Sequence, residues 1–183
     1  SRGLGDVYKR QPHEAIIWET AVTLGYLRDE SAIDALLEMI KNDALTLNTT
    51  YSAFFALGKI GSDLAISKLL ELYRGEIDWR DWRVRVLYVF HNDLKGKFGQ
   101  WHEEIITLAL AALQAREDVR IEAIHLLSVV REPRAIEPLC VLFADPLQHQ
   151  NLSFPGILVN ALAEIGGEEV LTILLQWLET YPY

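Results

Sequence analysis

Apolar residues recur along the chain at the spacing of an amphipathic helix. Stripes with the offsets i, i+3, i+4 and i+7 begin at Ile33, Ile66, Ile106, Ile136 and Leu171. This spacing places four side chains on one face of an α-helix. A second apolar segment precedes each stripe, starting at Leu24, Leu57, Leu87, Leu127 and Leu162. The pattern predicts five helix pairs, each joined internally by a short turn.

The residues at the predicted turns agree with this division. Ser31 and Ser62 stand where the second helices of the first two pairs begin, so we expect both to act as N-caps. Ser31 together with Asp34 also approximates a capping box. Small residues recur near the ends of four first helices, where we expect neighbouring helices to approach closely: Gly25, Gly58, Ser128 and Ala163.

The fold class predicted by these patterns is all-α. No segment alternates apolar and polar residues over more than a few positions, so no strand is expected. A single helix pair cannot bury its own stripe, and stacking of neighbouring pairs is the usual solution. We therefore expect a right-handed α-solenoid, an α-α superhelix.

Two segments carry a family resemblance. The stretches from Ala56 to Leu72 and from Val129 to Phe143 resemble HEAT repeats and, more narrowly, the short HEAT-like repeats first named in phycobilisome lyases. The resemblance covers about residues 15–180. It implies an armadillo-like helical array whose second helices line a concave surface.

On that implied surface the polar side of the second helices is acidic, with Asp34, Glu38, Glu71, Glu137 and Glu179. We expect an acidic groove that faces a basic or mixed partner. The alternative is that these carboxylates only keep the protein in solution.

Two parts of the chain depart from the repeat. Residues 1–11, SRGLGDVYKRQ, differ in composition from residues 12–183, the expected repeat array, and resemble a translated sequencing adapter. We expect them to be non-native; a genuine disordered arm is the alternative. The third pair carries about ten additional residues at 91–100, polar and with two glycines, which predict a loop that protrudes from one edge.

Charge and composition narrow the classes of partner. The chain has 17 basic and 26 acidic side chains, a formal charge of -9, which disfavours nucleic acid and anionic membranes. No run of roughly 18 uncharged apolar residues or secretory signal is present, so we expect a cytoplasmic protein. The apolar face of the last predicted helix favours end-to-end contact through the C-terminal repeat, by continuation of the array or by dimerisation.

No catalytic motif, cofactor site or metal motif is evident in the sequence. The single cysteine, Cys140, occupies a stripe position and is expected to lie in the core. His91 and His102, with Asp93, Glu103 and Glu104 nearby, could supply metal ligands, but their spacing matches no zinc motif. We favour an ordinary solvated helix start, where Glu103 and Glu104 meet the positive end of the helix dipole.

The strongest candidate for partner binding is a tryptophan- and arginine-rich segment with the neighbouring insertion. Both residue types dominate binding hot spots. The candidate contacts are Trp79, Arg80, Trp82, Arg83, Lys95, Lys97 and Trp101. An alternative interpretation is structural: the tryptophans fill the space between repeats and the arginines pair with Glu76, Asp78 or Asp81.

The leading functional hypothesis is a non-enzymatic scaffold or adaptor that binds another protein. The resemblance implies an alternative, a bilin lyase or phycobilisome-processing accessory protein, although no residue is assignable as a chromophore ligand. A third hypothesis, a HEAT-like DNA-repair glycosylase, is disfavoured by the acidic charge.

Overall fold

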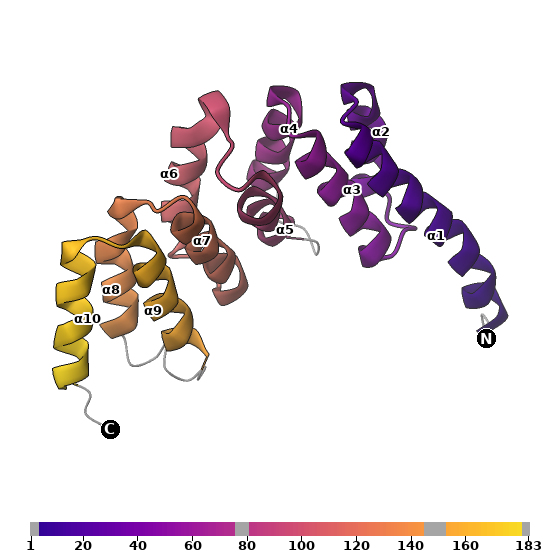
Figure 1. Cartoon of the computed structure of the whole chain (residues 1–183). Coiled ribbons are helices and arrows are strands. Elements are labelled where there is room, and N and C mark those ends of the chain that lie inside the picture. The colour runs from indigo at the N-terminus through magenta and orange to yellow at the C-terminus, as the bar shows by residue number, and fades with distance from the viewer. Residues whose placement is uncertain (1–3, 76–80, 145–152, 181–183) are drawn as a thin grey trace. The chain divides into compact units, whose positions relative to one another are not determined.

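A computed structural model describes residues 4–75, 81–144 and 153–180 of the chain, with side chains placed for 13–75, 81–144 and 153–179. Every regular element in these ranges is helical, and the described residues contain no strand (Figure 1). The predicted all-α class is confirmed.

The described part of the chain contains ten α-helices, whose order follows the predicted alternation of first and second helices. They are α1 (Leu4–Leu27), α2 (Ile33–Lys41), α3 (Leu47–Ile60), α4 (Asp63–Arg74), α5 (Arg83–Tyr88), α6 (His102–Ala112), α7 (Glu117–Val129), α8 (Ile136–Ala144), α9 (Phe154–Ile165) and α10 (Glu168–Thr180). A π-helical turn, Val89–Leu94, extends α5. The first helix begins at Leu4, inside the segment expected to be non-native.

The helices form two compact units. Unit 1 comprises residues 1–94 and 98–101, and unit 2 comprises residues 95–97 and 102–183. In unit 1, α3 packs against α1, α2 and the π-helical turn. In unit 2, α7 packs against α6 and α9, and α9 also contacts α8 and α10 (Figure 1).

The apolar stripes are buried to different extents. All four stripe residues of α2 are buried, as are Ile66, Leu69 and Leu70 of α4. In α8, Cys140 is only partly buried, so its predicted core position holds in part. The stripe of α10 differs from the others because three of its leucines are exposed.

Glycine permits the closest helix contacts of unit 1. A Cβ atom on Gly25 would lie 2.7 Å from Cα of Ala56, and one on Gly58 would lie 2.7 Å from Cγ1 of Val89. Real Cβ atoms do not come so close, so these positions confirm the predicted close approach of α3 to α1 and to the π-helical turn. At the equivalent positions of unit 2, Ser128 is buried but Ala163 is exposed, so the prediction is wrong for the last pair.

A residue with a positive φ angle follows every first helix. Positive φ angles follow α1, α3, the π-helical turn, α7 and α9, at Arg28 (55°), Gly61 (59°), Lys95 (49°), Arg131 (54°) and Gly166 (76°). After α7 the arrangement is a Schellman motif, in which Arg131 N–H donates to Ser128 O at 2.9 Å and Glu132 N–H to Leu127 O at 3.0 Å. The repeat thus recurs in backbone conformation even where the sequence has no glycine.

One predicted N-cap is confirmed and the other is wrong. Ser62 caps α4 by accepting a hydrogen bond from Ala65 N–H at 3.3 Å. Ser31 does not cap α2, because a single 3-10 turn, Glu30–Ala32, precedes that helix. Asp29 caps this turn by accepting a hydrogen bond from Ser31 N–H at 2.9 Å. Ala32 is the N-cap of α2, so Ser31 and Asp34 form no capping box.

The protruding loop predicted at residues 91–100 is also corrected. Its first four residues continue the π-helical turn, and its apolar residues turn inward. Leu94 and Phe98 are buried, and the Phe98 ring lies 5.7 Å from that of Phe90. The glycines and lysines of this segment indicated a loop, but Leu94 and Phe98 bind it to the core of unit 1.

A left-handed residue with a Cβ atom costs about 1 kcal/mol relative to glycine. We therefore expect Arg28→Gly and Arg131→Gly each to raise the free energy of unfolding by up to about 1 kcal/mol. Urea denaturation followed by circular dichroism measures the change. The matched control is Arg116→Gly, at a residue with φ of -59°. An equal effect of all three substitutions would contradict the strain argument.

Candidate protein-interaction surfaces

The described part of the tryptophan- and arginine-rich segment is held within unit 1. The Trp82 ring lies 5.2 Å from the Phe54 ring. Arg83 binds the Asp81 carboxylate through two nitrogens, with Nη2 2.6 Å from Oδ2 and Nε 2.9 Å from Oδ1. These contacts match the structural alternative for Trp82 and Arg83. Trp79 and Arg80 lie outside the described residues.

The predicted contacts in the insertion differ from one another in exposure. Lys95 and Lys97 are exposed, whereas Trp101 is half-buried. The indole Nε1 of Trp101 is buried and has no hydrogen-bond partner among the described residues. The lysines are therefore accessible to a partner, and most of Trp101 belongs to the protein interior.

All five carboxylates of the predicted acidic face are exposed, but their surroundings differ. In unit 1, Glu38 lies 3.5 Å from Lys41 Nζ, and both oxygens of Glu71 lie 2.9 Å from Lys68 Nζ. In unit 2, Glu137 and Glu179 belong to a part of the sequence without cations. Residues 136–183 contain six acidic side chains and no lysine or arginine. The acidic character predicted from the sequence is therefore strongest in this segment.

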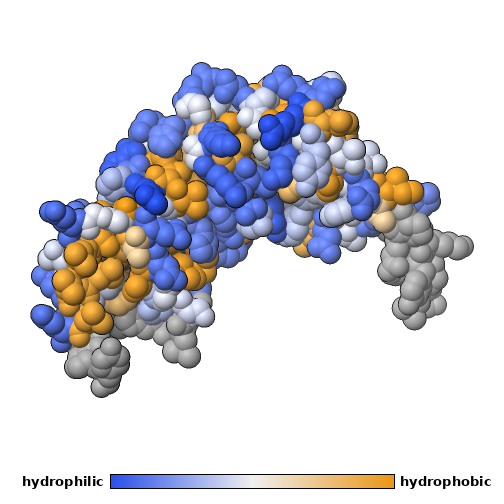
Figure 2. All heavy atoms as spheres, viewed as in Figure 1, coloured by the Kyte–Doolittle hydropathy of each residue, from blue (hydrophilic) through white to orange (hydrophobic). Residues whose placement is uncertain are grey.

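The outer face of α10 is apolar and open. Leu171, Leu175 and Leu178 are 60%, 53% and 65% exposed. They lie at the helical offsets i, i+4 and i+7, so they form one surface. Figure 2 shows hydrophobic residues gathered over this helix.

An apolar hollow of about 400 Å³ adjoins the leucine face. Its walls come from α8, α9 and α10, and its lining residues are Phe143, Val159, Leu174, Trp177 and Leu178. The rings of Phe143 and Trp177 are stacked, 3.6 Å apart and 8° from parallel. This pair gives the hollow a flat aromatic wall.

A second surface, in unit 1, was not predicted from the sequence. Tyr51, Phe55 and Lys59 lie at i, i+4 and i+8 along α3. Arg85 of α5 stacks on the Tyr51 ring, and Lys59 Nζ lies 4.9 Å from the centre of the Phe55 ring. We call this surface the aromatic–cation face; it consists of Tyr26, Tyr51, Phe55, Lys59, Arg85, Tyr88 and His91.

The spacing of the α3 aromatics is visible in the sequence, but their pairing with α5 is not. Tyr88 and His91 follow Arg85 at the offsets i+3 and i+6, the first of which is a helical repeat. Gly58 of α3 closely approaches Val89 and Asp93 of the π-helical turn that extends α5. The small residue is visible in the sequence, but the residues that it meets are not.

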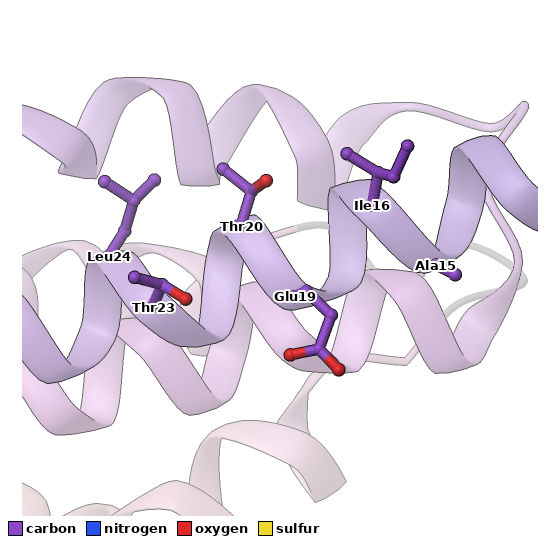
Figure 3. A pocket seen from close by; sticks show the side chains of 6 residues that line it. All are labelled: Ala15, Ile16, Glu19, Thr20, Thr23 and Leu24. Carbon is purple, nitrogen blue, oxygen red and sulfur yellow. The ribbon is translucent and has the colours of Figure 1, made fainter.

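A hollow on α1 has the geometry of an open helix surface. Figure 3 shows its lining side chains, all of which belong to α1: Ala15, Ile16, Glu19, Thr20, Thr23 and Leu24. A surface formed by one helix cannot surround a small ligand. We assign no site to it.

The residues considered for metal binding or catalysis do not form such a site in the described structure. Among the described residues, no group of three histidine, cysteine, aspartate or glutamate side chains could hold a metal ion. The Asp93 carboxylate lies 3.1 Å from Lys59 Nζ, and the His91 ring packs on Tyr88. Burial raises the pKa of the Cys140 thiol, and the negative charge of Glu169 raises it further. The higher pKa disfavours the nucleophilic thiolate form.

No described helix has the length and apolar character needed to cross a membrane.

Glu103, one of the considered metal ligands, joins an ion-pair cluster in unit 2. Arg134 Nε lies 2.7 Å from Glu132 Oε1, and Arg134 Nη1 lies 3.1 Å from Glu103 Oε2. Glu132 also accepts a hydrogen bond from Arg134 N–H at 3.0 Å and caps the turn before α8. The hydrogen bond from the Arg134 side chain is the main reason that the pKa of Glu132 is lowered.

Because the pKa of Glu132 is lower in the folded protein, its ionised form stabilises the fold. This contribution is complete above the pKa of a free glutamate, 4.5, and disappears as the pH falls through the lower folded value. We expect Glu132→Gln to lower the thermal midpoint at pH 7 and to have a smaller effect at pH 3. Glu137→Gln, at an exposed position of α8, is the control and should leave the pH 7 midpoint unchanged. An effect of Glu132→Gln that is the same at both pH values would contradict the role of its charge.

No family model matches the chain, and no curated protein matches it in sequence.

Proposed function

We propose that this protein is a helical-repeat module that binds another protein, and that its principal contact is the leucine face of α10. The proposal includes the HEAT-like identity of the repeats and their stacking into one solenoid. The regular order of first and second helices and the positive φ angle that follows each first helix support both.

The exposed leucines of α10 are the observation that carries the proposal. Burying a leucine side chain contributes about 1.5–3 kcal/mol. A helix that leaves Leu171, Leu175 and Leu178 more than half exposed therefore retains much binding free energy. Contiguous apolar surface of this kind is typical of protein-interaction sites.

The charge around the leucine face selects the class of partner. Glu168 and Glu179 lie on the same helix and are exposed, and residues 136–183 provide no basic side chain to balance them. A second copy of this face would bring like charges together. An amphipathic helix with an apolar stripe and basic flanks would match both the leucines and the carboxylates.

The hollow beside the leucines supplies a position for one anchoring side chain. Its aromatic wall of Phe143 and Trp177 is fixed by ring stacking, so an apolar side chain of the partner could enter without much ordering of the protein. Trp79, Arg80, Trp82 and Arg83 are a separate predicted contact. The intramolecular contacts of Trp82 and Arg83 make α10 the stronger candidate.

The test uses three synthetic helical peptides and the full chain. The first has leucines at i, i+3, i+4 and i+7 with lysines at the other positions; the second replaces lysine by glutamate; the third scrambles the first. We expect only the first to bind, more weakly at high salt. The double variant Leu171→Gln/Leu175→Gln should weaken binding at least about tenfold, because each lost contact is worth about 1 kcal/mol or more.

The matched control is Leu64→Gln, at a 45% exposed leucine of α4 in unit 1. Circular dichroism establishes that each variant remains helical. Equal binding of the basic and scrambled peptides, or equal loss in the control and the double variant, would reject the leucine face as the binding site.

A further inference from the structure

We propose that Arg85 forms a second binding site, in unit 1, for the carboxylate of an acidic peptide segment. The site lies on the aromatic–cation face, and its charge preference is opposite to that proposed for α10. It goes beyond the proposed function because it assigns a different ligand to a different unit.

Two tyrosine rings hold the guanidinium group in place. The Cζ atom of Arg85 lies 3.5 Å from the centre of the Tyr51 ring and 5.2 Å from that of Tyr88. Tyr88 in turn packs edge-on against His91, with 5.2 Å between the ring centres. Stacking of this kind fixes a guanidinium group and stabilises its charge without neutralising it.

Among the described residues, no carboxylate balances the charge of Arg85. Over these ranges Arg85 forms no ion pair and no hydrogen bond, and it packs on the two tyrosine rings. By contrast, Arg83 pairs with Asp81 and Lys59 pairs with Asp93. An unpaired, half-buried arginine is unusual in a chain with 26 acidic and 17 basic side chains.

The buried Nε atom limits how a ligand would bind. Nε of Arg85 is buried and has no hydrogen-bond partner in the described structure. A carboxylate would therefore bind at the end of the guanidinium group, where two parallel Nη–H donors match its two oxygens. The neighbouring tyrosine rings would contact the methylene groups of an aspartate or glutamate side chain.

Arg85 is a single cation without a carboxylate partner among the described residues, and a single cation favours a carboxylate ligand over a phosphate ligand. Lys59, the other cation of this face, is already neutralised by Asp93. A phosphate dianion or a nucleic-acid backbone normally needs several donors or cations. Near the paired lysine, the exposed Tyr26 ring packs on Phe55 at 5.8 Å and offers an apolar surface to residues that flank the carboxylate.

The test compares two capped peptides that differ only at the central residue, Ac-Pro-Leu-Glu-Leu-Pro-NH2 and its glutamine analogue, with the full chain. Capping removes the terminal carboxylate, so binding reports the side chain. We expect the glutamate peptide to bind about tenfold more tightly by NMR titration, because hydrogen bonds between charged groups are stronger than neutral ones. Arg85→Gln should remove this difference, and Arg85→Lys should retain only part of it because lysine cannot form the bidentate pair.

Two further measurements separate a lost site from a lost fold. Tyr88→Leu keeps Arg85 but removes one ring from its surroundings, so we expect a severalfold weaker affinity for the glutamate peptide. Arg116→Gln, which removes an exposed arginine paired with Asp118, is the control and should change nothing. Each variant should still bind the basic helical peptide, which tests α10 independently. Equal binding of the two capped peptides, no effect of Arg85→Gln, or tighter binding of inorganic phosphate than of the glutamate peptide would overturn the proposal.

Discussion

A helix with an apolar stripe on one side gains most of its stability in water from another helix that covers that stripe. In unit 1 this condition is met, because α3 packs against α1, α2 and the π-helical turn, and the stripe of α2 is buried. In unit 2 the contacts among α7, α8 and α9 bury most of the corresponding surface. The leucines of α10 are the exception, and their exposure makes this helix the place where the protein has most to gain from a partner.

The conformation of the backbone at the turns determines how the helices that cover the apolar stripes are positioned. A residue with a positive φ angle follows each first helix, where the chain reverses its direction within a few residues. Gly25 and Gly58 then let the helices of unit 1 come closer than any side chain would allow. The same contact brings the π-helical turn against α3, where Lys59 meets Asp93. In unit 1, the close packing of the helices therefore also brings the residues of this ion pair together.

The two proposed surfaces differ in which of their charged side chains lack a partner of opposite charge. Most described cations with short contacts have a carboxylate partner, such as Arg83 with Asp81 and Arg134 with Glu132 and Glu103. The C-terminal segment, residues 136–183, has carboxylates but no lysine or arginine, whereas Arg85 has no carboxylate partner among the described residues. An acidic apolar helix and an arginine that packs on aromatic rings suit ligands of opposite charge.

The sequence by itself determined the helical class, the order of the helices and the faces that carry apolar residues, because the 3.6-residue period is a local property of the chain. It also identified the acidic side chains and the structural alternative for Trp82 and Arg83. Only the tertiary structure decided that Arg28, Lys95 and Arg131 take the left-handed conformation, since side chains rarely adopt it without support from the surrounding contacts. Likewise, burial of Phe98, exposure of Leu175 and stacking of Arg85 on Tyr51 depend on which helices meet. Residues far apart in sequence determine those contacts, so no local pattern contains them.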